Sequence, residues 1–273
     1  MSICRLSDFC QLSDVGQRRK HNEDSSAVLP DLGLAMVADG MGGYKAGEVA
    51  SAIAVHRVLE QIRAFAEETR PGGVDDESGY TRASIAIRNA IVHANEEIFD
   101  KANGIPQCAG MGTTAVVALF YDDAVSLAHV GDSRAYRLRD DTLELVTHDH
   151  SLAQRFADQN GEGGTARPAP KNLVTRALGV ERTVRIEITQ TQLIAGDIFM
   201  LCSDGLSDMV PDDEIGLTLG KYAANLRQAA EALVAKANQN GGRDNISVVL
   251  LRPQPATGNR GRGFVPRLGK RRA

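Results

Sequence analysis

Carboxylate residues stand where apolar segments of this sequence end or begin. Asp39 directly follows the apolar residues 34–38 and opens the glycine-rich segment DGMGG. Glu23 and Asp24 come shortly before another apolar run. Three more acids occupy comparable positions along the chain: Asp132, Asp204 and Asp244. If the fold brought these segment ends together, their carboxylates could bind cations.

Two interpretations fit these acids. Taken singly, each can be a turn former or a helix cap, because aspartate accepts hydrogen bonds from nearby backbone amides. Taken together, converging carboxylates would need a neutralising cation, because unpaired buried charge is costly. Ligands that are all oxygen favour hard divalent ions, Mg²⁺ or Mn²⁺, over Zn²⁺. Spacing alone leaves both interpretations open.

The apolar pattern predicts helices and strands that are grouped along the chain. Hydrophobic repeats at three- and four-residue steps predict helices over 46–68, 81–102 and 226–237. Residues 121–124 have the composition of a tight hairpin turn. The predicted strands are 27–29, 34–38, 114–120, 125–130, 135–138, 143–146, 184–188, 198–202 and 246–251. This order favours an α+β fold, with antiparallel sheets covered by helices.

Composition argues against several classes of protein. The net charge is −4 and only 4% of residues are aromatic, so neither charge nor stacking favours a specific nucleic-acid surface. No apolar run approaches the ~18 residues of a membrane span, and the N-terminal segment lacks the apolar core of a signal peptide. The four cysteines lack metal-site spacing, so we expect reduced thiols in a cytoplasmic protein.

Two segments are predicted to be irregular. Residues 158–172 are rich in glycine and proline, which is typical of a functional or mobile loop. Residues 253–273 contain six basic and no acidic residues, which predicts a disordered basic tail. Such a tail could give salt-sensitive, non-specific attraction to nucleic acid or membranes. It could equally be a docking segment or a solubilising end.

Eight motifs, taken in order, resemble those of the PPM family, the metal-dependent serine/threonine protein phosphatases also called type 2C. They are SDVGQRRKHNEDS, VADGMGG, GMGTTAVV, VGDSRAYRL, THDHSL, VTRALG, CSDGLSD and GGRDNISVV. The match is closest to the bacterial branch and runs from residue 13 to about residue 251. The resemblance implies a four-layer α-β-β-α sandwich of two mainly antiparallel sheets. It also implies a catalytic domain over 1–252 with a flap at about 150–178.

The resemblance assigns roles to the strand-end acids. Two Mn²⁺ or Mg²⁺ ions would be bridged by Asp39, with the carbonyl of Gly40 on one of them. Glu23 would act largely through metal-bound water. Asp204 and Asp244 would bind the other ion. Asp132, together with Asp204, would hold a third ion that is bound more weakly. The residues supporting these ligands would be Asp24, Asp208 and Asn245.

The implied reaction is two-metal hydrolysis of phosphoserine or phosphothreonine in proteins, by a hydroxide that bridges the ions. Asp39, Asp204 and Asp244 would be catalytic through this water. Arg19 fits the phosphate-binding arginine of the family better than its neighbour Arg18, because it lies four residues before Glu23. Many eukaryotic relatives have histidine, a proposed general acid, where this chain has Met41. A water on the third ion beside Asp132 is our hypothesis for the proton source.

Other catalytic classes fit poorly. No cysteine begins a C-x5-R motif, no D-x-D ends a strand, and no P-loop motif is present. A non-catalytic relative that binds phosphoproteins is the alternative, although such proteins lose metal acids and this chain keeps them. Phosphorylated proteins, including a serine/threonine kinase, are the implied partners, and we expect a monomer. We interpret His56 and His93 as structural, and Asp149 as the N-cap of a helix over 150–158.

Overall fold

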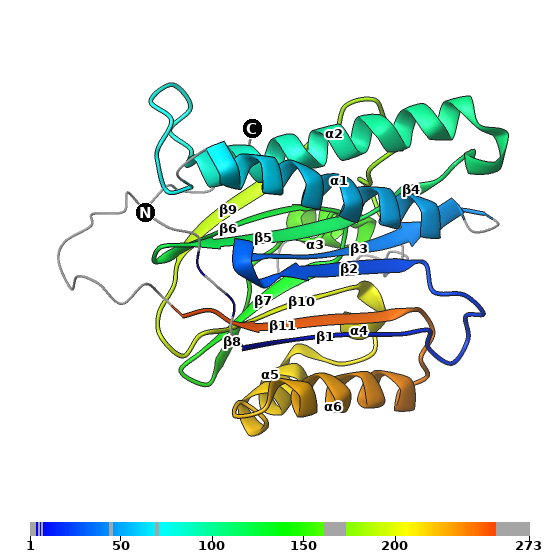
Figure 1. Ribbon diagram of the computed structural model, residues 1–273. Helices are drawn as coiled ribbons and strands as arrows, with labels where there is room; N and C mark the ends of the chain where they lie inside the picture. Colours follow the sequence, from blue (N-terminus) through cyan, green and yellow to red (C-terminus); the bar gives the residue numbers. More distant parts are fainter. Residues whose placement is uncertain are drawn as a thin grey trace.

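Two antiparallel β-sheets lie between two layers of helices in the computed structural model (Figure 1). The structure describes Cys4, Leu6 and residues 8–43, 46–68, 71–160 and 173–254. The predicted flap falls partly, and the predicted basic tail almost entirely, outside these residues. The four-layer α-β-β-α architecture expected from the motifs is confirmed.

The first sheet has the strand order β2-β3-β5-β6-β9, with β4 paired to β3. Its strands are β2 (Asp24–Leu29), β3 (Leu34–Met41), β4 (Gly112–Thr113), β5 (Ala115–Tyr121), β6 (Ala124–Val130) and β9 (Glu187–Gln192). A two-residue turn joins β5 to β6, since Tyr121 pairs with Ala124 and Asp122 has a φ of 47°. The predicted hairpin is therefore confirmed.

The second sheet has the order β1-β11-β10-β7-β8. Its strands are β1 (Asp8–Asp14), β7 (Arg134–Arg139), β8 (Thr142–Leu145), β10 (Ile198–Cys202) and β11 (Ile246–Arg252). Strands β10 and β11 are apolar on both faces because one face meets the other sheet and the opposite face meets helices. This explains why their sequences do not alternate.

The helices cover the outer faces of the sheets. The long helices α1 (Ala46–Glu68) and α2 (Arg82–Gly104) pack on the first sheet through a core that includes Val58, Ile62 and Ile91. Helices α5 (Asp212–Lys221) and α6 (Leu226–Gln239) cover the second sheet. A third core, with Val37, Phe199 and others, fills the space between the sheets. No helix in the described ranges has the length and apolarity that a membrane crossing needs.

Some sequence predictions were wrong in detail. The strand expected at 184–188 begins only at Glu187, because β9 pairs with β6 from His129 onward. Helix α3 (Leu152–Asn160) begins after Ser151, whose hydroxyl accepts a hydrogen bond from the Gln154 amide (3.2 Å). Asp149 is therefore not the N-cap. It instead binds Arg134, with Nη2 2.7 Å from Oδ2.

Candidate active site

The antiparallel pairing brings the strand-end acids to one end of the sandwich. Asp24, at the start of β2, lies directly opposite Asp39 near the end of β3. On the second sheet, Asp204 follows β10 and Asp244 precedes β11, its antiparallel neighbour. Asp132 lies between β6 and β7, in one of the segments that connect the two sheets. In Figure 1 this is the right-hand end, where α4 (Asp204–Ser207) lies.

The pKa shifts of these carboxyls have the direction expected for buried acids close to one another. Burial raises the pKa of Asp39 well above its usual range, and the nearby charges of Asp24, Asp204 and Asp244 raise it further. Burial, together with Asp132 and Asp244, raises the pKa of Asp204 to about 8. Burial and mutual repulsion together favour the retention of protons on these carboxyls.

The same acids fit a group of hard divalent cations. The Oδ1 atoms of Asp24 and Asp204 are buried without a hydrogen-bond partner among the described residues. A buried, unpartnered carboxylate oxygen is costly unless a cation binds it. The candidate ligands, with the Gly40 carbonyl, are all oxygen donors, which suits Mn²⁺ or Mg²⁺. The ligand roles of Glu23, Asp39, Gly40, Asp132, Asp204 and Asp244 remain predictions.

Glycine is required at position 40 by the close approach of two neighbouring segments. A Cβ on Gly40 would lie 2.1 Å from the carbonyl oxygen of Gly47, in α1, and 2.5 Å from that of Glu23. A side chain there would push apart the helix and the loop that carries Glu23. This contact accounts for one of the glycines that follow Asp39.

Hydroxyls and one amide hold the acidic segments in place. The Asp39 amide donates to Thr114 Oγ1 (2.9 Å), and Thr113 Oγ1 donates to the Asp39 carbonyl (2.8 Å). Asp24 accepts a hydrogen bond from Ser203 Oγ (2.8 Å). The Asn245 side chain accepts a hydrogen bond from the Glu23 amide (2.8 Å). It also donates to the carbonyls of Val15 and His21, in the loop that precedes Glu23. Sequence reasoning had singled out Asn245 and Asp24 but not the threonines or Ser203.

Arg19 lies at the edge of the acids. Its Nη2 atom is 2.6 Å from Asp244 Oδ2, and about half of its side chain is exposed (49%). The hydrogen bond to Asp244 raises the pKa of Arg19. Arg18 is exposed and contacts this region through its backbone amide, which donates to Gly242. The structure thus places Arg19 beside one of the strand-end acids, and its role in phosphate binding remains a prediction.

One polar cluster was missed by sequence reasoning. Among the described residues, the group of potential ligands whose atoms all lie within 4.8 Å of one another is His129, His150 and Glu187. Arg176 already supplies a positive charge there, with Nη1 3.2 Å from Glu187 Oε1. His150 Nδ1 accepts a hydrogen bond from the Gly131 amide (3.1 Å), and its Nε2 lies 3.2 Å from Glu187 Oε1 and 3.1 Å from Arg176 Nη1. These features favour a structural cluster over a metal site.

Comparison with known proteins identifies the family. The family model described as Protein phosphatase 2C matches residues 16–247, which include every acid described above. The chain belongs to the protein phosphatase 2C family. A relative named Serine/threonine phosphatase stp, from Listeria welshimeri, is 38% identical over 245 residues, covering 88% of this chain and 93% of that protein.

Solved structures of family members share the fold. The catalytic domain of the serine threonine protein phosphatase PstP, solved in complex with two manganese ions, superposes with a TM-score of 0.77 at 32% identity, covering 90% of this chain and 97% of that one. The full PstP of Mycobacterium tuberculosis is 36% identical over 245 residues, which cover 89% of this chain and 44% of that protein. The protein phosphatase 2C fold thus accounts for the whole sandwich.

Proposed function

We propose that this protein phosphatase 2C chain hydrolyses phosphoserine and phosphothreonine in proteins, with Mn²⁺ or Mg²⁺ as cofactor. The observation that carries the proposal is the convergence of carboxylates from both sheets, with the Asp24 and Asp204 Oδ1 atoms unpartnered. Relatives named as serine/threonine phosphatases, and the manganese complex of PstP, support the reaction and the ion.

The carboxylates of Asp39, Asp204 and Asp244 would hold two ions, with Glu23 and the Gly40 carbonyl beside them. Asp132 and Asp204 would hold a third. When bound, such ions lower the pKa of a water and offset charge on the phosphoryl oxygens. Asp24, Asp208 and Asn245 would position these ligands, Asn245 by fixing the loop that carries Glu23.

Arg19 would bind the phosphoryl group. A planar guanidinium can donate two parallel hydrogen bonds to phosphate oxygens, and Arg19 would exchange its bond to Asp244 for the substrate. Water would attack phosphorus opposite the leaving seryl or threonyl oxygen. Met41 carries no transferable proton, so we place proton delivery to that oxygen on the Asp132 side of the site.

We further propose that residues 1–252 form one catalytic domain with a flap at about 150–178, acting in the cytoplasm as a monomer. A serine/threonine kinase and its targets would be the phosphorylated partners. This extension rests on the family resemblance and on the relatives' names.

The test is hydrolysis of p-nitrophenyl phosphate and of a phosphothreonine peptide by the full chain. Rates would be measured without metal, with Mn²⁺ and with Mg²⁺, for the wild type and Asp204→Asn. We expect metal-dependent turnover that the substitution reduces by at least ~100-fold, because a ligand that acts in the transition state is lost. No turnover by folded protein with either ion would favour the phosphoprotein-binding alternative.

A further inference from the structure

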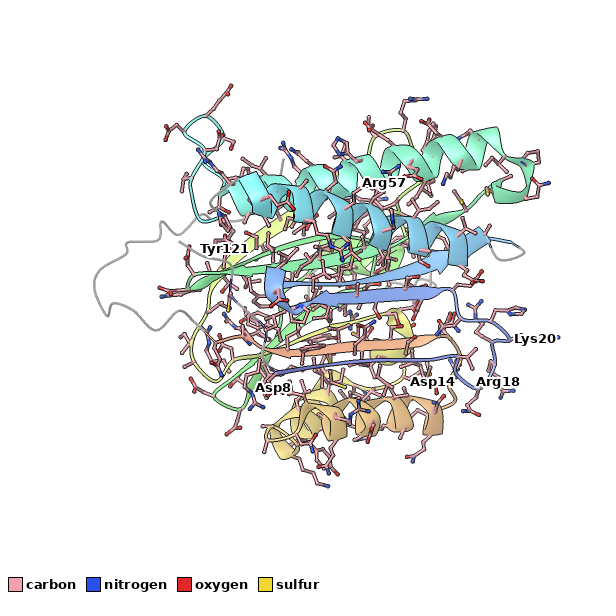
Figure 2. The ribbon with its side chains drawn as sticks, in the orientation of Figure 1. Asp8, Asp14, Arg18, Lys20, Arg57 and Tyr121 are labelled. Atoms are coloured by element: carbon pink, nitrogen blue, oxygen red, sulfur yellow. The ribbon has the colours of Figure 1, made fainter. Side chains whose placement is uncertain are left out.

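A group of exposed cations surrounds the predicted phosphate-binding arginine. Arg18 and Lys20 flank Arg19 on the loop between β1 and β2, and Arg243 precedes Asp244. We name Arg18, Lys20 and Arg243 the basic rim. All three are exposed, and none forms an ion pair with another described residue. Figure 2 labels Arg18 and Lys20 on the loop that projects at the right-hand end of the sandwich.

Hydrogen bonds and close packing fix the backbone of the two turns that carry the basic rim. The amides of Gln17 and Arg18 both donate to the Gly242 carbonyl, at 2.7 and 3.2 Å. A Cβ on Gly16 would lie 2.2 Å from the Asp244 carbonyl oxygen, so the two turns are in close contact. Asn245 Nδ2 fixes the loop at Val15 and His21. The backbone of both turns is thus fixed beside the acids before any substrate arrives, which lowers the ordering cost of binding.

The charge of the rim contrasts with the rest of the molecule. The chain as a whole carries −4, yet residues 17–21, QRRKH, contain no acid. Two of the neighbouring acids are already engaged: Asp14 accepts from the Gly16 amide and from Asn238, and Asp244 pairs with Arg19. Unpaired surface cations attract anionic ligands at low ionic strength.

We propose that the basic rim selects phosphorylated segments that carry aspartate or glutamate beside the phosphorylated residue. The inference rests on the proposed function, since it names the class of its substrates. An extended peptide advances about 3.3–3.6 Å per residue. Arg18 and Lys20, one position on either side of Arg19, can therefore reach side chains of the substrate about two to four residues from its phosphorylated residue. Arg19 binds the phosphoryl group, and the rim binds its acidic neighbours.

The experiment uses phosphothreonine peptides whose flanking residues are glutamate, glutamine or lysine. Binding is measured by fluorescence anisotropy with Mn²⁺ on the Asp204→Asn chain, and kcat/KM on the otherwise wild-type chain. Each is measured with and without the double substitution Arg18→Glu and Lys20→Glu. The matched control is Arg63→Glu, an exposed arginine in the same chain. Position 63 lies sixteen residues after Gly47 on α1, or about 24 Å along the helix.

We expect the wild type to prefer the glutamate peptide over the glutamine peptide by about three- to tenfold, as for a few exposed ion pairs. The preference should shrink at 300 mM NaCl and be lost or reversed by the double substitution, while Arg63→Glu preserves it. Equal binding of the three peptides, or a preference that survives the double substitution, would overturn the inference. Absence of turnover with normal binding preference would count against the proposed function and leave the rim supported.

Discussion

At the scale of single residues, Arg19 and Arg18 form a natural comparison. Arg19 contacts Asp244, whereas the Arg18 side chain is exposed. We expect Arg19→Ala to lower kcat/KM for p-nitrophenyl phosphate about 10- to 100-fold, because a charge-assisted hydrogen bond to phosphate is lost. Arg18→Ala is the control, since this small substrate has no acidic flank. Equal losses in both variants, measured by steady-state kinetics, would contradict the assignment.

The sequence predicted residues of the site unevenly. The acids were found because eight motifs occur in family order. The histidine cluster was missed because His129, His150 and Glu187 come from separate segments with no ligand spacing, and only the β6–β9 pairing brings two of them together. Thr114 and Ser203 were missed because a hydroxyl that binds a backbone amide leaves no pattern in the sequence.

At the scale of elements, burial decided which strands could be predicted. Strand β5 is buried at every position and was found from its apolar run. Strand β1, DFCQLSD, was not predicted because it is an edge strand in which Cys10 alone is buried. The short helix α4 and the helix α5 were missed as well. Their buried apolar residues, Leu206, Ile215 and Leu219, are too few to give a clear helical repeat.

His150 connects three elements at the base of the predicted flap. Its amide donates to the Gly131 carbonyl (2.9 Å), and its carbonyl accepts from the amide and hydroxyl of Thr175 (2.7 and 2.9 Å). Its ring accepts from the Gly131 amide and faces Glu187. The ring therefore helps to fix the loop of Asp132, and its pKa is lowered to about 4, chiefly by burial.

We expect His150→Ala to lower the free energy of unfolding by about 1–3 kcal/mol, because the buried Gly131 amide loses its ring partner. Amide hydrogen exchange should rise in residues 131–134 and 173–178. His93→Ala, on the exposed face of α2, should change neither quantity appreciably. Unchanged exchange at 131–134 in His150→Ala would show that the ring does not hold this loop.

At the scale of the whole molecule, the acids link stability to pH and metal. Burial raises the pKa of Asp24 to about 7, of Asp132 to about 6 and of Asp204 to about 8. The unfolded chain releases these protons near pH 4, so between pH 4 and 8 the folded, metal-free protein binds more protons. Its free energy of unfolding should therefore fall as the pH rises through this window.

Metal should reverse that trend, because cations bind the deprotonated carboxylates. With Mg²⁺ at about 100 times its Kd, we expect a gain of about 2.7 kcal/mol in the free energy of unfolding. For a chain of this size that corresponds to about 5–10 °C in Tm. Thermal unfolding at pH 6 and pH 8 measures the effect. The gain should be larger at pH 8, and a gain that is equal or larger at pH 6 would contradict this linkage. Asp204→Asn should reduce it at both.

The place of β11 in the second sheet has a consequence for synthesis on the ribosome. This strand lies between β1 and β10, and Asp244 and Asn245 directly precede it. A nascent chain that has emerged only as far as α6 therefore has β1 and β10 without β11, the strand that pairs with both. It also lacks Asp244, so the group of strand-end acids is incomplete. The first sheet and its helices can assemble earlier, since their segments come before Leu193. The centre would then be completed in one late step, so a prematurely terminated chain would be inactive as well as unstable.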